Sequence, residues 1–407
     1  MHTIVFLGSN KSGSSRDAIF SAAEMGYFTV LLTDRHKWLK QREEFTDVHQ
    51  MIFVDDLLDK DVIYEQISLL KDQGKQVKAF VSFIDPLVST AAQISKELGL
   101  TELSVNALYQ MEDKTRFRET LKNNPITPSY SIFPLDMDQY DMFEKYVSNV
   151  PVILKSPVSK GSKDVLLIHS REEFIKATQY FRSRFPEAPI LLEEYLDGPQ
   201  YLIEVVVCHS ETTVVAIIEQ EISRVNRFII TGYTMPAQLS SKVDKKLNAA
   251  IQSIMEDIGL KHGTCHLEMR LVNEEWKLIE INPRISGGAV NQLILEATGI
   301  NLVKETLKLN LGEEPCLKPS KNESAFLQYI TVNSPGRLIK VIGKNKALNM
   351  EGVKKVYIKP RKGSILSPPL SMGDRYAYIL ASSEDPLKAR DFAKTAAKEI
   401  KFYLEPM

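Results

Sequence analysis

Two short strands joined by a turn are predicted by the stretch His266-Leu-Glu-Met-Arg-Leu-Val-Asn-Glu-Glu-Trp-Lys-Leu-Ile-Glu-Ile-Asn-Pro-Arg284. Apolar and polar residues alternate in it on both sides of the turn-prone Asn273-Glu274-Glu275. A three-residue turn pairs Val272 with Trp276, and such a turn can also carry a bulge that shifts the register by one residue. The stretch therefore indicates a β-hairpin whose register is set at this turn.

This register places oxygen-bearing side chains on one face of the hairpin. Glu268 lies directly opposite Glu280, and Asn282 points to the same face two residues further along its strand. Like charges roughly 5 Å apart at Cβ destabilise a bare sheet. The pair is therefore either a chance feature of a solvated hairpin or a site for hard divalent cations, which prefer oxygen ligands. After Pro283, the glycine-rich Ile285–Gly288 can bring backbone N–H groups close to an anion.

The composition is that of a globular protein with more than one domain. The chain has 407 residues, 43% of them hydrophobic, and its length favours two or three domains with ample cores. A formal net charge of −1 gives no basic field for nucleic acid, and no run approaches the roughly 18 apolar residues of a membrane span. Three widely spaced cysteines fit a reducing compartment, and the first residues lack a signal-peptide pattern. We therefore expect a cytoplasmic protein that binds neither nucleic acid nor membrane.

The N-terminal part has the pattern of a parallel α/β domain. A buried-strand run at residues 3–7 is followed by the loop Gly8–Gly13, a helical pattern to about Met25, and a second strand, Thr29–Thr33. The loop has Ser14 where a P-loop has Lys, and it lacks the central glycine of the dinucleotide fingerprint. A tight structural turn is the first interpretation, and a ligand-facing loop or a dehydrogenase-like dinucleotide site are the alternatives.

Another buried strand, Ala79–Phe83, is followed by Ile84-Asp-Pro-Leu. Ligands bind beyond the carboxyl ends of strands in open α/β sheets, so Phe83 to Pro86 are candidates for lining a substrate pocket. An ordinary βα loop is the alternative. A helical segment near residues 106–122 contains Lys114, and Pro125 and Pro128 then mark a linker.

A strand, a Ser/Gly/Lys loop and a second strand are predicted between Pro151 and Val165. Backbone N–H groups, hydroxyls and ammonium groups in one loop, Ser159-Lys160-Gly161-Ser162, suit a lid over a polyphosphate. Lys155, at the end of the first strand, can place a point charge on phosphate oxygens. An ordinary charged hairpin turn is the alternative.

The stretch from Ile190 to Gln200 is a strand that enters a turn at Gly198. Its backbone beside the apolar Leu196 can bind an adenine edge, and Glu194 or Gln200 can accept hydrogen bonds from ribose hydroxyls. A strand with a polar exit is the alternative interpretation.

The remaining sequence completes the domain plan. After the strands at 201–207 and 213–219, we expect an irregular apolar loop over Phe228–Ala237 and an amphipathic helix over Lys242–Ile258. In the C-terminal part, the pattern predicts a final helix from about Pro386 to Tyr403. It also predicts four short strands, Phe326–Val332, Gly336–Ile342, Val353–Tyr357 and Arg375–Ala381.

The sequence His262-Gly-Thr-Cys265-His266 imitates the spacing of metal ligands. Zinc sites use three or four nitrogen or sulfur ligands, and no second cluster of Cys or His is close in sequence. A zinc site is therefore not expected here. His266 falls on the predicted face of Glu268, which favours a supporting or substrate-side role.

Taken in order, these motifs resemble the ATP-grasp superfamily. The matching residues are Lys114, Lys155, Ser159–Ser162, Glu193-Glu194-Tyr195-Leu196, Glu268 and Glu280-x-Asn282-Pro-Arg284. The phrase Ile279–Gly288 and the chain length are most similar to the bacterial L-amino-acid ligases. Those enzymes condense two unprotected L-amino acids into a dipeptide and cleave ATP to ADP and phosphate.

The resemblance implies a mixed α/β and α+β multidomain fold. It implies an N-terminal parallel α/β domain at residues 1–110 and an ATP-grasp domain at 111–310, with a mobile lid lobe at about 125–195. A C-terminal α+β domain like that of biotin carboxylase follows at 311–407.

The resemblance also implies a role for each matching residue. Lys114 and Lys155 hold the α/β-phosphates, Ser159, Lys160, Gly161 and Ser162 form the lid, and Glu193, Glu194, Tyr195, Leu196 and Gln200 line the adenosine site. Many relatives carry a ribose-binding Glu at the position of Gln200. Two Mg²⁺ ions, replaceable by Mn²⁺, are held by Glu268, Glu280 and Asn282. Phosphoryl transfer and the tetrahedral intermediate are assisted by Arg284 and by the N–H groups of Gly287 and Gly288.

The implied function is ATP-dependent dipeptide synthesis through an aminoacyl phosphate. Expected substrate-pocket residues are Phe83, Pro86, Tyr233, Met235 and His266, of which Tyr233 and Met235 favour an apolar side chain on the activated amino acid. Rival functions are a related ligase or carboxylase with another acid or nucleophile, and a non-catalytic ATP-binding regulator. The oligomeric state is left open, with a homodimer as one alternative.

Overall fold

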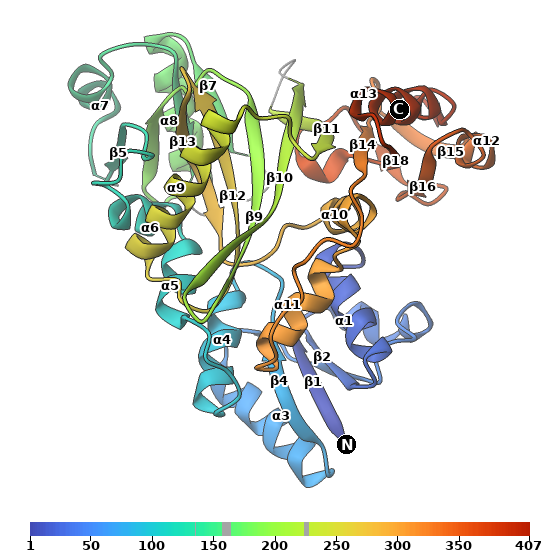
Figure 1. Cartoon of the computed structure of the whole chain (residues 1–407). Helices are drawn as coiled ribbons and strands as arrows, with labels where there is room; N and C mark the ends of the chain where they lie inside the picture. The colour runs from blue at the N-terminus through green and yellow to red at the C-terminus, as the bar shows by residue number, and fades with distance from the viewer. Residues whose placement is uncertain (135, 157–163, 224–227) are drawn as a thin grey trace.

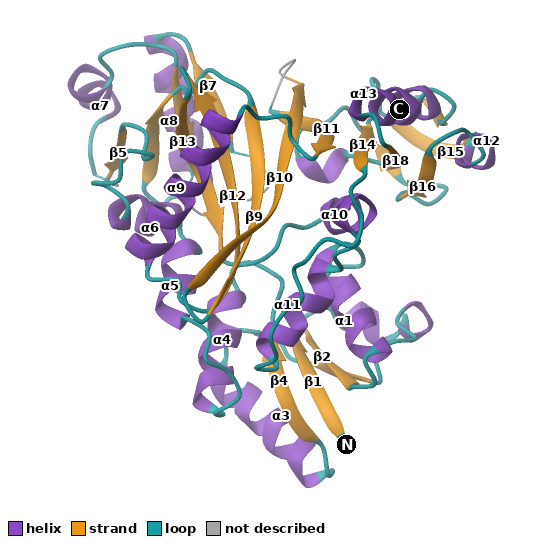
Figure 2. Ribbon diagram, viewed as in Figure 1, coloured by secondary structure: helices purple, strands orange, loops and turns teal. Residues whose placement is uncertain are grey.

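The computed structural model describes residues 1–134, 136–156, 164–223 and 228–407. Within these residues the strands form four sheets. Figure 1 shows a sheet near the N-terminus at the bottom, a lobe with α7 and α8 at the upper left, and the C-terminal region at the upper right. The long strands β9, β10 and β12 lie between these parts (Figure 2).

The N-terminal sheet is parallel, as predicted, with the strand order β3-β2-β1-β4. Alternate residues of β1 are buried on opposite faces: Ile4 and Phe6 pack with α1, whereas Val5 and Leu7 pack with α3 and α4. Burial on both faces explains the unbroken apolar run in the sequence. The elements are β1 (His2–Leu7), α1 (Ser14–Glu24), β2 (Phe28–Thr33), α2 (His36–Leu39), η1 (Arg42–Glu44), β3 (Gln50–Phe53), α3 (Lys60–Asp72), β4 (Gln76–Val81) and α4 (Val88–Glu97).

The predicted helical segment at 106–122 is two helices, α5 (Val105–Met111) and α6 (Lys114–Thr120). The side chain of Asp113 accepts hydrogen bonds from the backbone N–H groups of Thr115 and Arg116, so it caps the second helix. This cap places Lys114 at the first position of α6.

A lobe of four antiparallel strands follows, in the order β5-β8-β6-β7. It contains β5 (Tyr130–Phe133), α7 (Gln139–Tyr146), β6 (Val152–Lys155), β7 (Val165–Ile168), α8 (Arg171–Arg184) and β8 (Ile190–Glu194). Phe133, Phe174 and Phe181 form its separate core. The lid residues expected at Ser159, Lys160, Gly161 and Ser162 lie outside the described part of the chain.

The central feature is an eight-stranded sheet with the order β13-β12-β9-β10-β11-β14-β18-β16. Its strands are β9 (Gln200–Cys208), β10 (Glu211–Ser223), β11 (Ile229–Met235), β12 (Gly263–Val272), β13 (Glu275–Asn282), β14 (Ser324–Ile330), β16 (Val353–Ile358) and β18 (Ala377–Ser383). The sheet crosses the domain boundary predicted at residue 311, because β11 pairs with β14. The predicted boundaries themselves stay a prediction.

The irregular loop expected over Phe228–Ala237 was wrong, because residues Ile229–Met235 form strand β11. This strand pairs with β10 on one side and with β14 on the other. Both partners are needed to satisfy its backbone groups, and β14 lies about a hundred residues further along the chain, so local sequence did not reveal the strand.

Helices cover the central sheet. One face packs against α9 (Ser241–Ile258), whose apolar side includes Leu247 and Ile251. The opposite face packs against α10 (Val290–Thr298), and α11 (Leu302–Asn310) joins α10 to α1.

The C-terminal region also contains a three-stranded sheet, β17-β15-β19. The predicted C-terminal end of the last helix, Tyr403, was wrong. Helix α13 (Pro386–Ala397) ends earlier and is followed by strand β19 (Lys401–Glu405). The long-range pairing of β19 with β15 fixes this strand. The other elements are β15 (Gly336–Ile342), α12 (Lys344–Leu348), β17 (Ile365–Leu366) and η2 (Met372–Asp374). Among the described residues, no helix is both long and apolar enough to cross a membrane.

Candidate active site

The hairpin β12–β13 pairs Glu268 with Glu280, as the sequence predicted, but its turn differs. The turn has two residues, Asn273 and Glu274, both with positive φ, and Leu271 rather than Val272 pairs with Trp276. The register changes by one residue at Glu268/Met269, which leaves Ile279 as an extra residue on β13. The shorter turn and the bulge therefore compensate, and the two carboxylates remain opposite each other.

The two carboxylates have different electrostatic surroundings. Burial, and then the charge of Glu280, raises the pKa of Glu268 to about 7. Burial also acts on Glu280, but Lys114 and Lys155 outweigh it and hold the pKa of Glu280 below its ordinary value. The ammonium group of Lys114 is 3.3 Å from the Glu280 carboxylate. A divalent cation between these carboxylates would offset both the burial and the repulsion that favour a proton on Glu268.

Two cavities meet at this pair. A cavity of about 490 Å³ lies on one side and a smaller one of about 90 Å³ on the other, and both are lined by Lys114, Glu268 and Glu280. The smaller cavity is also lined by Lys155 and by the residues expected around adenosine, which are Glu193, Glu194, Tyr195, Leu196 and Gln200. The larger cavity is lined by Asn282, Arg284, Gly287 and Gly288. The pair of carboxylates thus stands where the two cavities meet.

The raised pKa of Glu268 predicts a pH dependence of cation binding. Ligation requires the ionised carboxylate, so the affinity for a Mg²⁺–ADP complex should fall about tenfold per pH unit below pH 7. Titration calorimetry between pH 5.5 and pH 8 measures this slope. In Glu268→Gln the affinity should be weaker but should show only the pH dependence of the nucleotide itself. Equal slopes in the two proteins would contradict the assignment.

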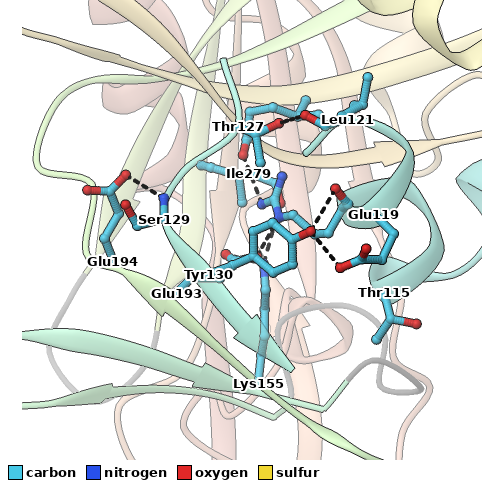
Figure 3. Close-up of polar contacts among 12 residues, drawn as sticks. Thr115, Glu119, Leu121, Thr127, Ser129, Tyr130, Lys155, Glu193, Glu194 and Ile279 are labelled. Carbon is cyan, nitrogen blue, oxygen red and sulfur yellow. Dashed lines mark hydrogen bonds and ion pairs between the residues drawn. The ribbon is translucent and has the colours of Figure 1, made fainter. Parts of the chain in front are cut away.

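Lys155 is held in place by a buried charge cluster. Its ammonium group lies 2.6 Å from the carboxylate of Glu193 and 3.4 Å from the carbonyl oxygen of Ile279, the bulge residue (Figure 3). Arg118 donates to the same Glu193 carboxylate at 2.7 Å and to the carbonyls of Leu278 and Ile279 at 2.9 and 2.8 Å. The Glu193 side chain is thus engaged within the protein, and its backbone lies in β8 between β5 and β6.

The linker between α6 and the lobe is fastened by side-chain hydrogen bonds. The carboxylate of Glu194 accepts from the backbone N–H of Ser129 at 2.9 Å, and Thr127 donates to the carbonyl of Leu121 at 2.7 Å (Figure 3). Glu194 therefore supports this linker through one carboxylate oxygen and also lines the smaller cavity, so its contact with a ribose hydroxyl stays a prediction.

Gln200 connects two charged groups. Its amide nitrogen donates to Glu268 at 3.2 Å, and its amide oxygen accepts from Arg270 at 3.2 Å. The neutral amide thus orients Glu268, which a second carboxylate at this position would instead repel.

His266 orients Asn282. Its Nδ1 lies 2.8 Å from the carbonyl oxygen of Arg284, and its Nε2 lies 3.3 Å from the Asn282 amide nitrogen. Burial, and then Arg284, lower the pKa of His266 to about 4, so the ring is neutral near pH 7. With Nδ1 protonated, Nε2 accepts from the amide nitrogen, which leaves the Asn282 oxygen as the atom available to a cation.

Arg284 joins the hairpin to the N-terminal domain through an ion pair with Asp85, in which its Nε lies 2.8 Å from the carboxylate. Asp85, Arg284, Gly287 and Gly288 also line a third cavity of about 180 Å³ together with the loop before α1. In that loop, a Cβ on Gly13 would lie 3.0 Å from the backbone nitrogen of Gly288. The N-terminal loop therefore approaches the glycine-rich segment closely and faces a cavity, which favours the ligand-facing alternative.

The residues expected to line the substrate pocket do not all line the same cavity. Pro86, Tyr233 and His266 line the 490 Å³ cavity. Phe83 lines the 180 Å³ cavity instead, and Met235 is 3% exposed in the hydrophobic core and lines none of these three cavities.

Three family models match successive parts of the chain. An ATP-grasp N-terminal domain matches residues 20–101, an ATP-grasp domain matches residues 148–292, and an L-amino acid ligase C-terminal domain 2 matches residues 328–405. The chain belongs to the ATP-grasp superfamily. The family confirms the predicted fold class, including the N-terminal parallel sheet.

Individual relatives of this ATP-grasp chain are distant in sequence. An uncharacterized protein, y4rH, of Sinorhizobium fredii is 26% identical over 261 residues, which are 63% of this chain and 54% of that protein. Dapdiamide A synthase of Enterobacter agglomerans is 23% identical over 268 residues, 62% of each protein. The chain thus spans less than two thirds of either relative. The crystal structure of an L-amino acid ligase from Bacillus licheniformis shares the fold over 99% of this chain and 98% of that chain, with a TM-score of 0.83 and 19% identity.

Two buried residues of this ATP-grasp site carried no sequence signal. Arg118 is fully buried, and its partners are 75 to 161 positions away in the chain. Glu204, on β9, accepts hydrogen bonds from the backbone N–H of Ser286 at 3.0 Å and from the Ser286 hydroxyl, and so fixes the glycine-rich segment Ile285–Gly288. Burial raises the pKa of Glu204 to about 7. Only the folded chain brings these groups together.

Replacing Glu204 by Leu should lower the free energy of unfolding by about 1–3 kcal/mol, because the buried N–H and hydroxyl of Ser286 lose their acceptor. Urea denaturation measures the change. Glu204→Gln keeps an acceptor and should cost less. Equal losses in the two variants would show that these hydrogen bonds do not contribute.

The fold separates His262 from His266, the two histidines of the stretch at which no zinc site was expected. His262 lies beside Cys208 and His209, with donor atoms within 4.8 Å of one another, whereas His266 faces the large cavity. A structural zinc site takes four ligands, and this group offers three among the described residues.

Proposed function

We propose that this ATP-grasp protein is a carboxylate–amine ligase that joins two unprotected L-amino acids into a dipeptide at the expense of MgATP. The observation that carries the proposal is the position of Glu268 and Glu280 at the passage between the two cavities. A nucleotide in the smaller cavity would direct its terminal phosphate towards an acid in the larger one. L-amino-acid ligase and dapdiamide A synthase among the similar proteins support this substrate class.

The smaller cavity has the groups that a nucleotide needs. The backbone of Tyr195 and Leu196 can bind the adenine edge, and Lys114 and Lys155 offer ammonium groups for the phosphates. Glu268, Glu280 and the Asn282 oxygen form an oxygen donor set that fits Mg²⁺ or Mn²⁺. The cations supply charge neutralisation when the anionic phosphate and acid approach each other.

The larger cavity would hold the acid and the amine. A carboxylate oxygen of the first amino acid attacks the γ-phosphorus, the bond to ADP breaks, and an acyl phosphate forms. The amine of the second amino acid then attacks the acyl carbon, loses a proton, and displaces phosphate. Arg284 and the N–H groups of Gly287 and Gly288, which line this cavity, would stabilise the developing negative charge.

The cavity wall favours an apolar side chain on the activated amino acid. Leu202, Ile230, Tyr233 and Val290 line the same space. We further propose that the protein acts in the cytoplasm on small molecules, with a homodimer as one alternative for its assembly.

A screen of phosphate release from MgATP with pairs of L-amino acids tests the function, with the product mass measured. Hydroxylamine should replace the amine substrate and give a hydroxamate of the activated acid, because it traps acyl phosphates. Phosphate release that needs one amino acid alone and yields no condensed product would overturn the dipeptide reaction. Absence of any acid-dependent turnover and of any hydroxamate would favour a nucleotide-binding regulator.

A further inference from the structure

A positive charge from the C-terminal region reaches the large cavity. Arg375, between η2 and β18, lines this cavity together with Tyr233 and Met372. It stands outside every motif that identified the nucleotide site, and its region of the chain is matched by the L-amino acid ligase C-terminal domain model.

The guanidinium group of Arg375 is held firmly. Its Nε donates to the carbonyl of Met372 at 3.1 Å and its Nη1 to the carbonyl of Ile230 at 3.3 Å. Its central carbon lies 3.8 Å from the centroid of the Tyr329 ring. These contacts fix the group in position without neutralising its charge.

Two arginines of this cavity differ in their ion pairs: the charge of Arg284 is balanced by a carboxylate, whereas that of Arg375 is not, in the part of the chain that the structure describes. Arg284 is paired with Asp85. Among the described residues, no carboxylate comes within the 4.0 Å of an ion pair with Arg375. A partly buried cation with this surplus charge favours an anionic ligand in the cavity that it lines.

Arg375 also contacts, through Tyr329, the glycine-rich segment beside which the acyl carbon would react. The hydroxyl of Tyr329, on whose ring Arg375 rests, accepts from the backbone N–H of Ala289 at 3.3 Å. A Cβ on Gly288 would lie 3.0 Å from the same hydroxyl. Arg375 and Gly288 therefore both line the large cavity, and the Tyr329 side chain lies against both of them.

We propose that Arg375 binds the α-carboxylate of the amine substrate, and so selects free amino acids as the second partner. This inference rests on the proposed ligase function. The carboxylate to be activated must lie beside Glu268, Glu280 and Arg284. The second amino acid keeps its carboxylate, whose carbon is within about 3 Å of the attacking nitrogen because only two bonds separate them. Its cation must therefore line the same cavity, as Arg375 does.

The test compares three nucleophiles with one accepted acid and MgATP. L-alanine has the carboxylate, L-alaninamide lacks its charge, and hydroxylamine needs no carboxylate subsite. Arg375→Gln should raise the KM for alanine about 10- to 100-fold and leave hydroxamate formation within about twofold of wild type. Arg337→Gln, at an exposed arginine of the same region, should change none of the three rates.

Each outcome decides the proposal. Equal losses with all three nucleophiles in Arg375→Gln would show that Arg375 serves acid activation or folding, and would overturn the inference. A loss specific to alanine in Arg116→Gln instead would overturn the inference and move the subsite to Arg116, which lines the same cavity and lies over Tyr109. Should Arg375→Gln not fold, wild type still decides, because equal kcat/KM for alanine and alaninamide would contradict carboxylate binding. A wild type that makes no hydroxamate from any acid would instead remove the proposed function.

Discussion

Glu280→Gln is expected to lower kcat by at least about 10³-fold and to weaken Mg²⁺–nucleotide binding, because a cation ligand at the passage between the two cavities is lost. Several kcal/mol of charge stabilisation correspond to this factor. The substitution keeps the size of the side chain, and the amide can still accept a hydrogen bond from Lys114. Steady-state phosphate release and calorimetric titration with Mg²⁺–ADP measure the two effects.

The matched control for this variant is Glu275→Gln. Glu275 begins the same strand, is exposed, and forms its ion pair with Lys246 away from both cavities. It should retain wild-type turnover. Near-normal turnover in Glu280→Gln would show that the site lies elsewhere.

Arg284→Ala is expected to reduce kcat by about 10²–10³-fold, the usual effect of removing one group that stabilises charge in the transition state. Arg284 lines the larger cavity and not the smaller one, so the affinity for Mg²⁺–ADP should stay close to that of wild type. Arg284→Ala should thus lower turnover alone, whereas Glu280→Gln should lower both turnover and nucleotide affinity. Single-turnover phosphate release and the same titration measure it.

Loss of Arg284 also leaves Asp85 without the arginine that now pairs with it, which can affect folding. The double variant Asp85→Asn/Arg284→Ala removes the unpaired charge and should be equally inactive. Recovery of turnover in the double variant would show that the effect of Arg284→Ala is structural.

The carboxylate hairpin was predictable because its evidence is local. Period-two alternation placed Glu268, Glu280 and Asn282 on one face, and a turn was required between the strands. The exact turn was not predictable, since Asn273 and Glu274 adopt positive φ without the glycine that usually marks a two-residue turn. The carbonyl of the bulge residue Ile279 accepts hydrogen bonds from Arg118 and Lys155, which lie far away in the chain.

The parts missed by sequence reasoning depend on partners far away in the chain. Strand β11 has the local sequence of a loop, and its second neighbour, β14, comes from the C-terminal region. Arg284 and Asp85 are separated by 199 positions, and no local pattern relates them. Arg375 enters the cavity only after the C-terminal strands have joined the central sheet. Motif order can predict a nucleotide site, whereas the part of the cavity wall proposed to meet the second substrate is created by tertiary structure.

Because β14 completes the hydrogen bonds of β11, the last hundred or so residues form part of the same sheet as the central region and cannot be removed without exposing β11. A fragment ending at Asn310 would bare a row of backbone donors and acceptors along β11, an edge that recruits other chains and promotes aggregation. Shortened versions of this protein would thus have to keep β14 together with β11.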